Sequence, residues 1–276
     1  LVAWNAERLK YHAASAAMLA ASGADLVLLS ETDLGMARSG NRHTTADLAA
    51  GLGMGYAYGV EFIELGLGDE REQQWHAGEN NIAGLHGNAI LSKLPLTDLT
   101  LMRFAGSGRW FNGRDGEQRR LGGRMALAAR LPLGGKNVVA VTVHLESDSD
   151  PHDRARQMEE LLAALDRRYD GAAMVIGGDC NTAALPPASG FEDVEDFEPL
   201  FGALRKAGFH WRGANDRMAT QRTRPDGKPK PPFRRIDWLF TRGLTAAAPR
   251  TLPATDEDGL AISDHDAIAV DLSISA

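Results

Sequence analysis

Seven polar residues stand beside apolar, strand-like runs, a pattern that suggests a chemical site. Most follow such a run, and one precedes it; they are Asn5, Glu31, His144, Asp179, Asp237, Asp264 and His265. Buried strands tolerate carboxylates, amides and imidazoles only when these groups are paired or bind something. Oxygen ligands gathered around two imidazoles suit Mg²⁺ or Mn²⁺, with Ca²⁺ as an alternative, and the hydrolysis of phosphate esters.

The tripeptide Ser263-Asp264-His265 is the most informative of these motifs. His265 is a candidate general base, which needs a carboxylate to orient its ring. Successive side chains of an extended segment point to opposite sides, so Asp264 is better placed as a metal ligand. We expect Asp237 to orient His265, with both residues meeting at one sheet edge. The alternative for the tripeptide alone is a helix cap or a turn.

The run Gly177-Gly178-Asp179-Cys180-Asn181 follows an apolar strand and lets the backbone approach a ligand closely. Asp179 and Asn181 are two residues apart, so both can face one side and grip a water or a phosphate oxygen. An Asx turn is the alternative. Cys180 points the other way and is most simply a core residue.

Asn5 and Glu31 are expected to end adjacent parallel strands, whose carboxyl ends converge at one edge of a sheet. One carboxylate with several waters is how Mg²⁺ is often held. His144 would donate to a leaving oxygen or to the phosphate. Capping, a turn or a structural histidine is the alternative for each residue taken singly.

Composition limits the class of protein. The 276 residues carry a net charge of −7, with 43% hydrophobic and 24% charged residues, which is ordinary for a soluble globular chain. The charge disfavours a general nucleic-acid coat protein, and no apolar run is long enough to span a membrane. Walker A, Gly-x-Ser-x-Gly and zinc-type spacings are absent from the sequence. A single cysteine excludes an internal disulfide framework, and the chain begins without Met inside an apparent strand, so localisation stays open.

Residues 212–235 carry eight Lys or Arg residues against two Asp. A solvated, proline-rich loop is the simple interpretation. Because this stretch leads directly into Asp237, we expect it to recruit an anionic substrate instead. Arg222, Arg224, Lys228 and Lys230 are the residues that would do so.

Strand-like and helical patterns alternate along the whole chain. Strands are predicted at residues 1–5, 25–29, 56–62, 88–92, 124–131, 137–144, 173–176, 236–241 and 267–272, and helices at 8–22, 45–52, from 151 onward, and 198–207. Asp150 and Pro151 mark a helix start, and Gly134-Gly135 a hairpin turn. Residues 66–86 read as a long loop with lid function. With no repeat and no linker, one domain over residues 1–276 is the economical prediction.

In this order, the motifs resemble the endonuclease/exonuclease/phosphatase superfamily with its deoxyribonuclease I-like fold. The resemblance runs through Trp4-Asn5, Ser30-Glu31, Gly87 to Lys93, Val143-His144-Leu145, Gly178 to Asn181, Arg235 to Trp238 and Ser263 to His265. It covers essentially the whole chain. It implies an α/β four-layer sandwich of two packed sheets flanked by helices, with the site at one end. It also implies metal-dependent hydrolysis of phosphate esters.

Carried over residue by residue, the resemblance makes Glu31 the main metal carboxylate, with Asn5 beside it and Asp264 joining. Asp179 and Asn181 position nucleophile and phosphate, while His265 is general base or phosphate contact. Substrate contacts are expected from Asn88, Arg124, Arg222 and Arg224.

His144 resembles the histidine of the deoxyribonuclease I, sphingomyelinase and inositol phosphatase branches, which disfavours abasic-site repair. Ser30 and Cys180 depart from the residues common in relatives without removing a catalytic atom. We therefore expect a monomeric phosphodiesterase without an obligate protein partner. The alternatives are a DNA or RNA nuclease, a phosphomonoesterase and a catalytically silent binding module.

Overall fold

The computed structural model describes residues 1–105, 118–187, 189–224, 227 and 231–275, and its strands form two mixed sheets. The larger sheet has seven strands in the order β11 (Leu244–Leu252), β12 (Ala267–Ile274), β1 (Val2–Arg8), β2 (Leu26–Leu34), β4 (Leu85–Ser92), β3 (Gly55–Glu64) and β6 (Arg120–Gly122). The smaller sheet has five, in the order β10 (Asp237–Arg242), β9 (Ala173–Asp179), β8 (Lys136–His144), β7 (Met125–Leu133) and β5 (Thr97–Arg103).

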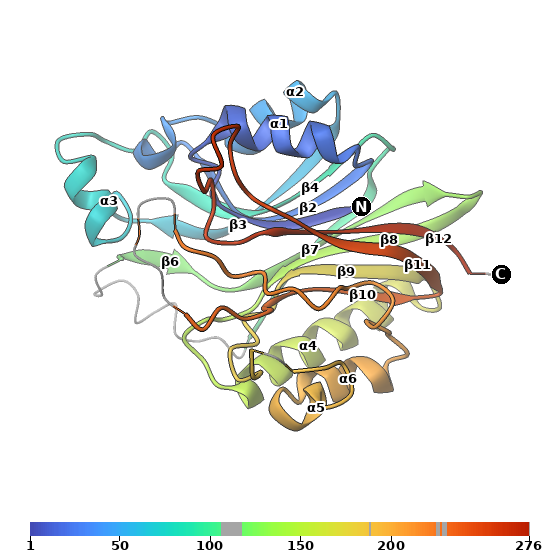
Figure 1. Ribbon diagram of the computed structural model, residues 1–276. Coiled ribbons are helices and arrows are strands. Elements are labelled where there is room, and N and C mark those ends of the chain that lie inside the picture. The colour runs from blue at the N-terminus through green and yellow to red at the C-terminus, as the bar shows by residue number, and fades with distance from the viewer. Residues whose placement is uncertain (106–117, 188, 225–226, 228–230, 276) are drawn as a thin grey trace.

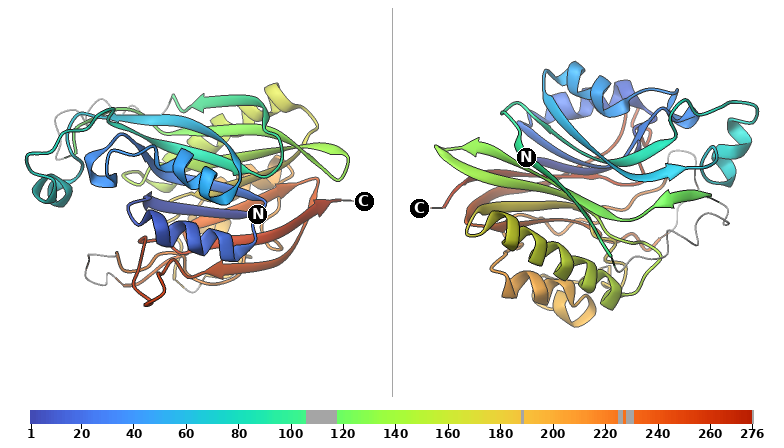
Figure 2. Two further views of the ribbon diagram at one scale, coloured as in Figure 1. Left: turned by 90° about the horizontal axis from the view of Figure 1, so that it is seen from above. Right: turned by 180° about the vertical axis from the view of Figure 1, so that it is seen from behind.

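Helices cover the outer faces of the two packed sheets, as Figures 1 and 2 show. The larger sheet is covered by α1 (His12–Ser22) and α2 (Thr44–Leu52), and the smaller by α4 (Pro151–Tyr169), α5 (Val194–Phe197) and α6 (Leu200–Lys206). The short helix α3 (Glu70–Trp75) lies at one end of the sandwich (Figure 1). Its Glu72 contacts Arg38 of the short 3-10 helix η1 (Ala37–Ser39). The predicted four-layer sandwich is therefore confirmed.

Three apolar clusters fill the spaces between the four layers. Strand β8 shows why the stretch Val138–Val141 at its centre is apolar throughout. Val139, Val141 and Val143 pack toward the helices α4 and α6, whereas Val138 and Ala140 pack between the two sheets. Alternate side chains of a strand point to opposite faces, so a strand buried on both faces needs a nearly continuous apolar run.

Two local predictions are confirmed. Helix α4 begins where expected, with Asp150 accepting a hydrogen bond from the backbone N–H of Asp153 at 2.9 Å and Pro151 in the first turn. The β7–β8 hairpin turns at Gly134 and Gly135, whose φ angles are 56° and 78°. Both glycines occupy the left-handed region that a tight hairpin turn requires.

Other local predictions need correction. Residues 66–86 are not a structureless loop, because they contain α3 and the first residues of β4. Strand β1 continues to Arg8, so α1 starts at His12 rather than at residue 8. Strands β5, β6 and β11 were not expected. Both β5 and β11 are edge strands without a strong apolar run: β5 alternates exposed with half-buried residues, and β11 is mostly exposed or half-buried. None of the helices in the described part of the chain is long and apolar enough to cross a membrane.

Candidate active site

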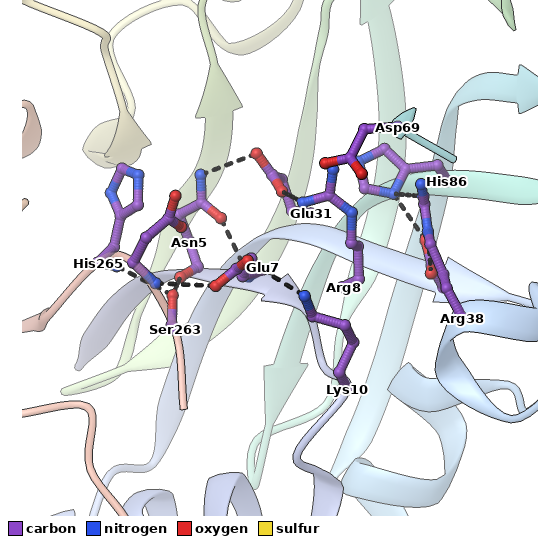
Figure 3. Close-up of polar contacts among 12 residues, drawn as sticks. Asn5, Glu7, Arg8, Lys10, Glu31, Arg38, Asp69, His86, Ser263 and His265 are labelled. Atoms are coloured by element: carbon purple, nitrogen blue, oxygen red, sulfur yellow. Dashed lines mark hydrogen bonds and ion pairs between the residues drawn. The ribbon is translucent and has the colours of Figure 1, made fainter. Parts of the chain in front are cut away.

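Asn5 links two carboxylates that come from different sheets. Its strand β1 pairs in parallel with β2, the strand of Glu31. Asn5 Nδ2 lies 3.2 Å from Glu31 Oε1 and 3.1 Å from Asp179 Oδ2, which belongs to β9 of the smaller sheet. Figure 3 shows the Asn5 amide turned toward Glu31. The amide therefore joins the two sheets at this end of the sandwich.

Asn5 and Glu31 do not end their strands, which corrects the sequence prediction. Both strands run on for three residues, and their pairing shifts register, between Asn5 and Arg8 on β1 and between Leu29 and Thr32 on β2. Glu31 has a φ of 55°, which is costly for a residue other than glycine. Such irregularities re-aim a side chain while the strand continues. Strained residues of this kind cluster at functional sites.

His265 and Asp237 meet across the sandwich. Asp237 opens β10, opposite Asp179 at the end of β9, whereas His265 precedes β12 of the other sheet. His265 Nδ1 lies 2.8 Å from Asp237 Oδ2, and His265 Nε2 lies 3.7 Å from Asp179 Oδ2. The two residues thus touch as expected, but they come from two sheets rather than from one sheet edge.

The backbone that carries His265 is fastened to strand β1. Trp4 Nε1 donates to the carbonyl of His265 at 2.9 Å, and Ser263 Oγ donates to the carbonyl of Asn5 at 2.8 Å. Trp4 and Ser263 are fully buried. These two bonds hold the imidazole in register with Asn5.

Electrostatics gives Asp179 and His265 different protonation behaviour. Burial raises the pKa of Asp179 to about 7, an effect that the His265 charge opposes and the Asp237 charge reinforces. Burial lowers the pKa of His265, but Asp237 and Asp179 outweigh it and raise that pKa well above its ordinary value. Near neutral pH His265 is therefore an imidazolium, while Asp179 is poised to exchange a proton.

His144 is a neutral hydrogen-bond donor that points at Asp179. Arg124 Nη1 lies 2.9 Å from His144 Nδ1, and a guanidinium only donates, so Nδ1 must accept and Nε2 carries the hydrogen. Burial and the Arg124 charge hold the pKa of His144 well below its ordinary value. His144 Nε2 lies 3.5 Å from Asp179 Oδ2, and Arg124 Nη1 also contacts Glu61 Oε1 at 3.2 Å.

Asn181 and Asn88 are more structural than expected. The backbone N–H of Asn181 donates to Asp179 Oδ1 at 2.8 Å, the Asx turn named as the alternative, and Asn181 Nδ2 donates to the carbonyl of Leu145 at 3.0 Å. Asn88 is fully buried, and its Nδ2 lies 3.4 Å from the carbonyl of Met125 on the facing sheet. Contact of Asn88 or Asn181 with substrate stays a prediction.

Asp264 faces the basic loop, residues 212–235. Its Oδ2 accepts from Arg224 Nε at 3.1 Å, and its backbone N–H donates to Glu7 Oε2 at 3.0 Å. Arg222 Nη1 is paired with Asp266 Oδ1 at 2.6 Å. Arg222 and Arg224 thus both have acidic partners, and their role in recruiting substrate stays a prediction. Lys228 and Lys230 lie outside the described residues.

Sequence reasoning missed several charged residues of this site, among them Glu7, Arg8 and Glu61. Glu7 and Glu61 are buried, and Arg8 contacts Glu31 Oε2 through its Nη1 at 2.9 Å. The signal for Glu61 was present, because it is a carboxylate inside the expected strand at 56–62. Glu7 stands two residues after Asn5, the same spacing as Asp179 and Asn181.

Two groups of donors could hold a divalent metal ion. The ligand atoms of Asp179, Asp237 and His265 lie within 4.8 Å of one another, and Asp237 Oδ1 is buried without a hydrogen-bond partner among the described residues. However, His265 is protonated and already bound to Asp237, whereas a metal ligand must be unprotonated. Glu31 suits a cation better. Burial raises its pKa, but Arg8 and the nearby histidines outweigh this and keep that pKa well below the ordinary value, so the carboxylate is charged.

A model of the endonuclease/exonuclease/phosphatase family matches residues 2–265, a span that includes every site residue predicted from the sequence. The chain belongs to this family. The resemblance expected from the sequence is thereby confirmed, and members of the family are mostly metal-dependent phosphoesterases.

Solved structures of the endonuclease/exonuclease/phosphatase family share the fold over the full chain. An endonuclease/exonuclease/phosphatase from Beutenbergia cavernae DSM 12333 is 20% identical, with a TM-score of 0.69 over 100% of this chain and 71% of that one. The human Nocturnin catalytic domain with bound sulfate is 16% identical, with a TM-score of 0.65 over 100% and 93%. D. rerio TDP2 complexed with a single-strand DNA product is 15% identical, with a TM-score of 0.61 over 99% and 97%. Among curated proteins, none matches.

Proposed function

We propose that this chain is a divalent-metal-dependent phosphodiesterase. The observation that carries the proposal is the cluster of three nitrogen atoms around one carboxylate oxygen of Asp179. Its Oδ2 lies within 3.1 to 3.7 Å of Asn5 Nδ2, His144 Nε2 and His265 Nε2. A carboxylate with a pKa of about 7, ringed by donors, is suited to take a proton from an attacking water.

The two histidines around Asp179 are suited to the other two roles in the reaction, charge stabilisation and hydrogen-bond donation. His265 carries a positive charge and is oriented by Asp237, so it stabilises negative charge that develops on the phosphoryl group. His144 offers a neutral N–H whose direction Arg124 fixes, and it donates to a non-bridging or leaving oxygen. These donors are set before the reaction, so little reorganisation is needed during the chemical step.

The metal ion would bind at Glu31, with Asn5 and Glu7 as neighbouring donors. Their oxygen atoms match the preference of Mg²⁺ and Mn²⁺. When bound, such an ion polarises the phosphoryl group and neutralises developing charge. The Asn5 amide, which contacts both Glu31 and Asp179, keeps the metal carboxylate and the proton acceptor at a fixed separation.

A nuclease is the second candidate, and one observation favours it. The structurally similar TDP2 from D. rerio was solved with a single-strand DNA product, and residues 212–235 of this chain are strongly basic. A positive segment beside a phosphoesterase site would hold a nucleic-acid backbone.

An activity panel tests the proposal. Purified protein with added Mg²⁺ or Mn²⁺ is assayed on an aryl phosphodiester, the matching aryl phosphomonoester, single-stranded DNA and RNA, a phospholipid and an inositol phosphate. We expect metal-dependent hydrolysis of at least one diester, abolished by Asp179→Asn. Hydrolysis of monoesters alone would contradict the diester preference. The absence of any activity, or activity unaffected by chelation, would refute the metal-dependent phosphoesterase.

A further inference from the structure

Helix α3 inserts a buried carboxylate into the site from outside the sheets. Glu72 is 2% exposed and lies at the centre of a charged cluster. Its Oε2 accepts from Arg38 Nη1 at 3.0 Å and from the backbone N–H of Asp69 at 2.9 Å. Its Oε1 lies 2.7 Å from Arg8 Nε, an ion pair outside hydrogen-bond geometry.

Arg8 connects Glu72 to the metal carboxylate. While its Nε contacts Glu72, its Nη1 donates to Glu31 Oε2 at 2.9 Å, so one guanidinium spans two carboxylates. Figure 3 shows Arg8 beside Glu31. The backbone turns sharply to place it there, because three consecutive residues, Glu7, Arg8 and Leu9, have φ angles of 40°, 71° and 54°. Such a strained run persists only where the surrounding contacts enforce it.

The far end of the cluster is rigid. Arg38 is fully buried and pairs with Asp33 through two contacts of 2.8 and 2.9 Å, one from Nε and one from Nη2. Paired, planar contacts of this kind fix a guanidinium in orientation as well as position. Asp33 lies on β2, two residues after Glu31. The contact with Arg38 therefore ties Glu72 to the same strand that presents Glu31.

The charges alternate in sign along the contacting side chains Glu31, Arg8, Glu72, Arg38 and Asp33. Arg8 alone beside Glu31 would cancel the negative charge that a cation needs, and its own burial would be costly. The Glu72 carboxylate offsets Arg8 on the opposite side. Glu31 then keeps its net attraction for a cation while Arg8 holds one of its oxygens in place.

We propose that Glu72 is a positioning residue of the metal site: by neutralising and holding Arg8, it lets Arg8 orient Glu31 without cancelling its charge. The inference rests on the proposed metal site at Glu31. It makes α3, a helix within the expected lid segment, a built-in part of the active site.

Binding of Mn²⁺ alone, measured by electron paramagnetic resonance at neutral pH, tests this inference without any substrate. The variants are Glu72→Gln, the double variant Arg8→Gln/Glu72→Gln, and Glu31→Gln. Glu198→Gln is the matched control, because Glu198 is a fully buried carboxylate whose partner is Arg154 of α4, in the opposite helix layer. Circular dichroism and urea unfolding establish that each variant is folded.

Glu72→Gln should weaken Mn²⁺ binding about 10- to 100-fold, the usual effect of losing a residue that supports a metal ligand. The double variant should bind Mn²⁺ several-fold more tightly than Glu72→Gln, because the unbalanced Arg8 charge is gone. Glu198→Gln should bind as wild type.

Three outcomes would overturn the inference. Unchanged Mn²⁺ affinity in Glu72→Gln would show that Glu72 does not act on the site. A double variant no tighter than Glu72→Gln would make Glu72 a merely structural residue. Wild-type protein whose Mn²⁺ binding is absent, or is unaffected by Glu31→Gln, would refute the proposed metal site itself, and the inference with it.

Discussion

Replacing Asp179 by Asn should stabilise the fold at alkaline pH while removing activity. The ordinary pKa of an aspartate is 3.8, and burial raises that of Asp179 to about 7. A raised folded-state pKa means that the folded chain binds the proton more tightly than the unfolded chain. The stability gained from this proton is complete below about pH 4 and is lost as the pH rises through 7.

The size of the effect follows from the difference between the two pKa values. One pKa unit corresponds to about 1.4 kcal/mol, so ionisation of Asp179 lowers the free energy of unfolding by up to roughly 4 kcal/mol between pH 4 and pH 8. Asn carries no charge and escapes this loss. The variant should therefore be more stable than wild type at pH 8 and close to it at pH 4.5.

Urea unfolding at both pH values, with a chelator present, measures this difference. Asp25→Asn is the control, because Asp25 forms an exposed ion pair with Lys93 and should change the free energy of unfolding little. An Asp179→Asn variant that is less stable than wild type at pH 8 would refute the reasoning. So would a stability difference that is equal at the two pH values.

Three further predictions concern the rest of the site. Glu31→Gln should lower activity by orders of magnitude and be partly rescued by raised Mg²⁺; full activity at low Mg²⁺ would contradict a metal ligand. His265→Ala should cost roughly 10²–10³-fold in kcat, and Asp237→Asn less. The double variant should be little worse than His265→Ala alone, whereas multiplicative losses would make Asp237 structural. Changing Arg222 and Arg224 to Gln should lower kcat/KM at low salt, with a smaller loss at high salt; an unchanged kcat/KM at low salt would show a merely solvated loop.

Much of the fold could be predicted because its signals are local. The apolar run at 138–143 is long enough to predict a buried strand, and Asp150 with Pro151 specifies a helix start. The register shifts next to Asn5 and around Glu31 could not be predicted in this way. They arise where two neighbouring strands adjust their pairing, and neither strand alone contains that information.

The candidate site was predicted as a set of residues but not as a geometry. The partnership of His265 with Asp237 spans two sheets, so it depends on how the sheets pack. Glu72 was missed because a six-residue helix is too short for a clear period, although its capping box with Asp69 is readable in the sequence. Its burial is decided by Arg8 and Arg38, which lie far away along the chain.

The central place of β1 bears on how the protein is made. Its Val2 pairs with Val27 of β2 on one side and with Ala269 of β12 on the other. During synthesis β12 is made after all the other strands. Until it is complete, β1 has no partner on that side and forms an apolar sheet edge that can pair with another chain. The loop that brings His265 to Asn5 arrives with that same late strand. An unfinished chain is therefore expected to be prone to aggregation, and the step that closes the sheet also completes the proposed active site.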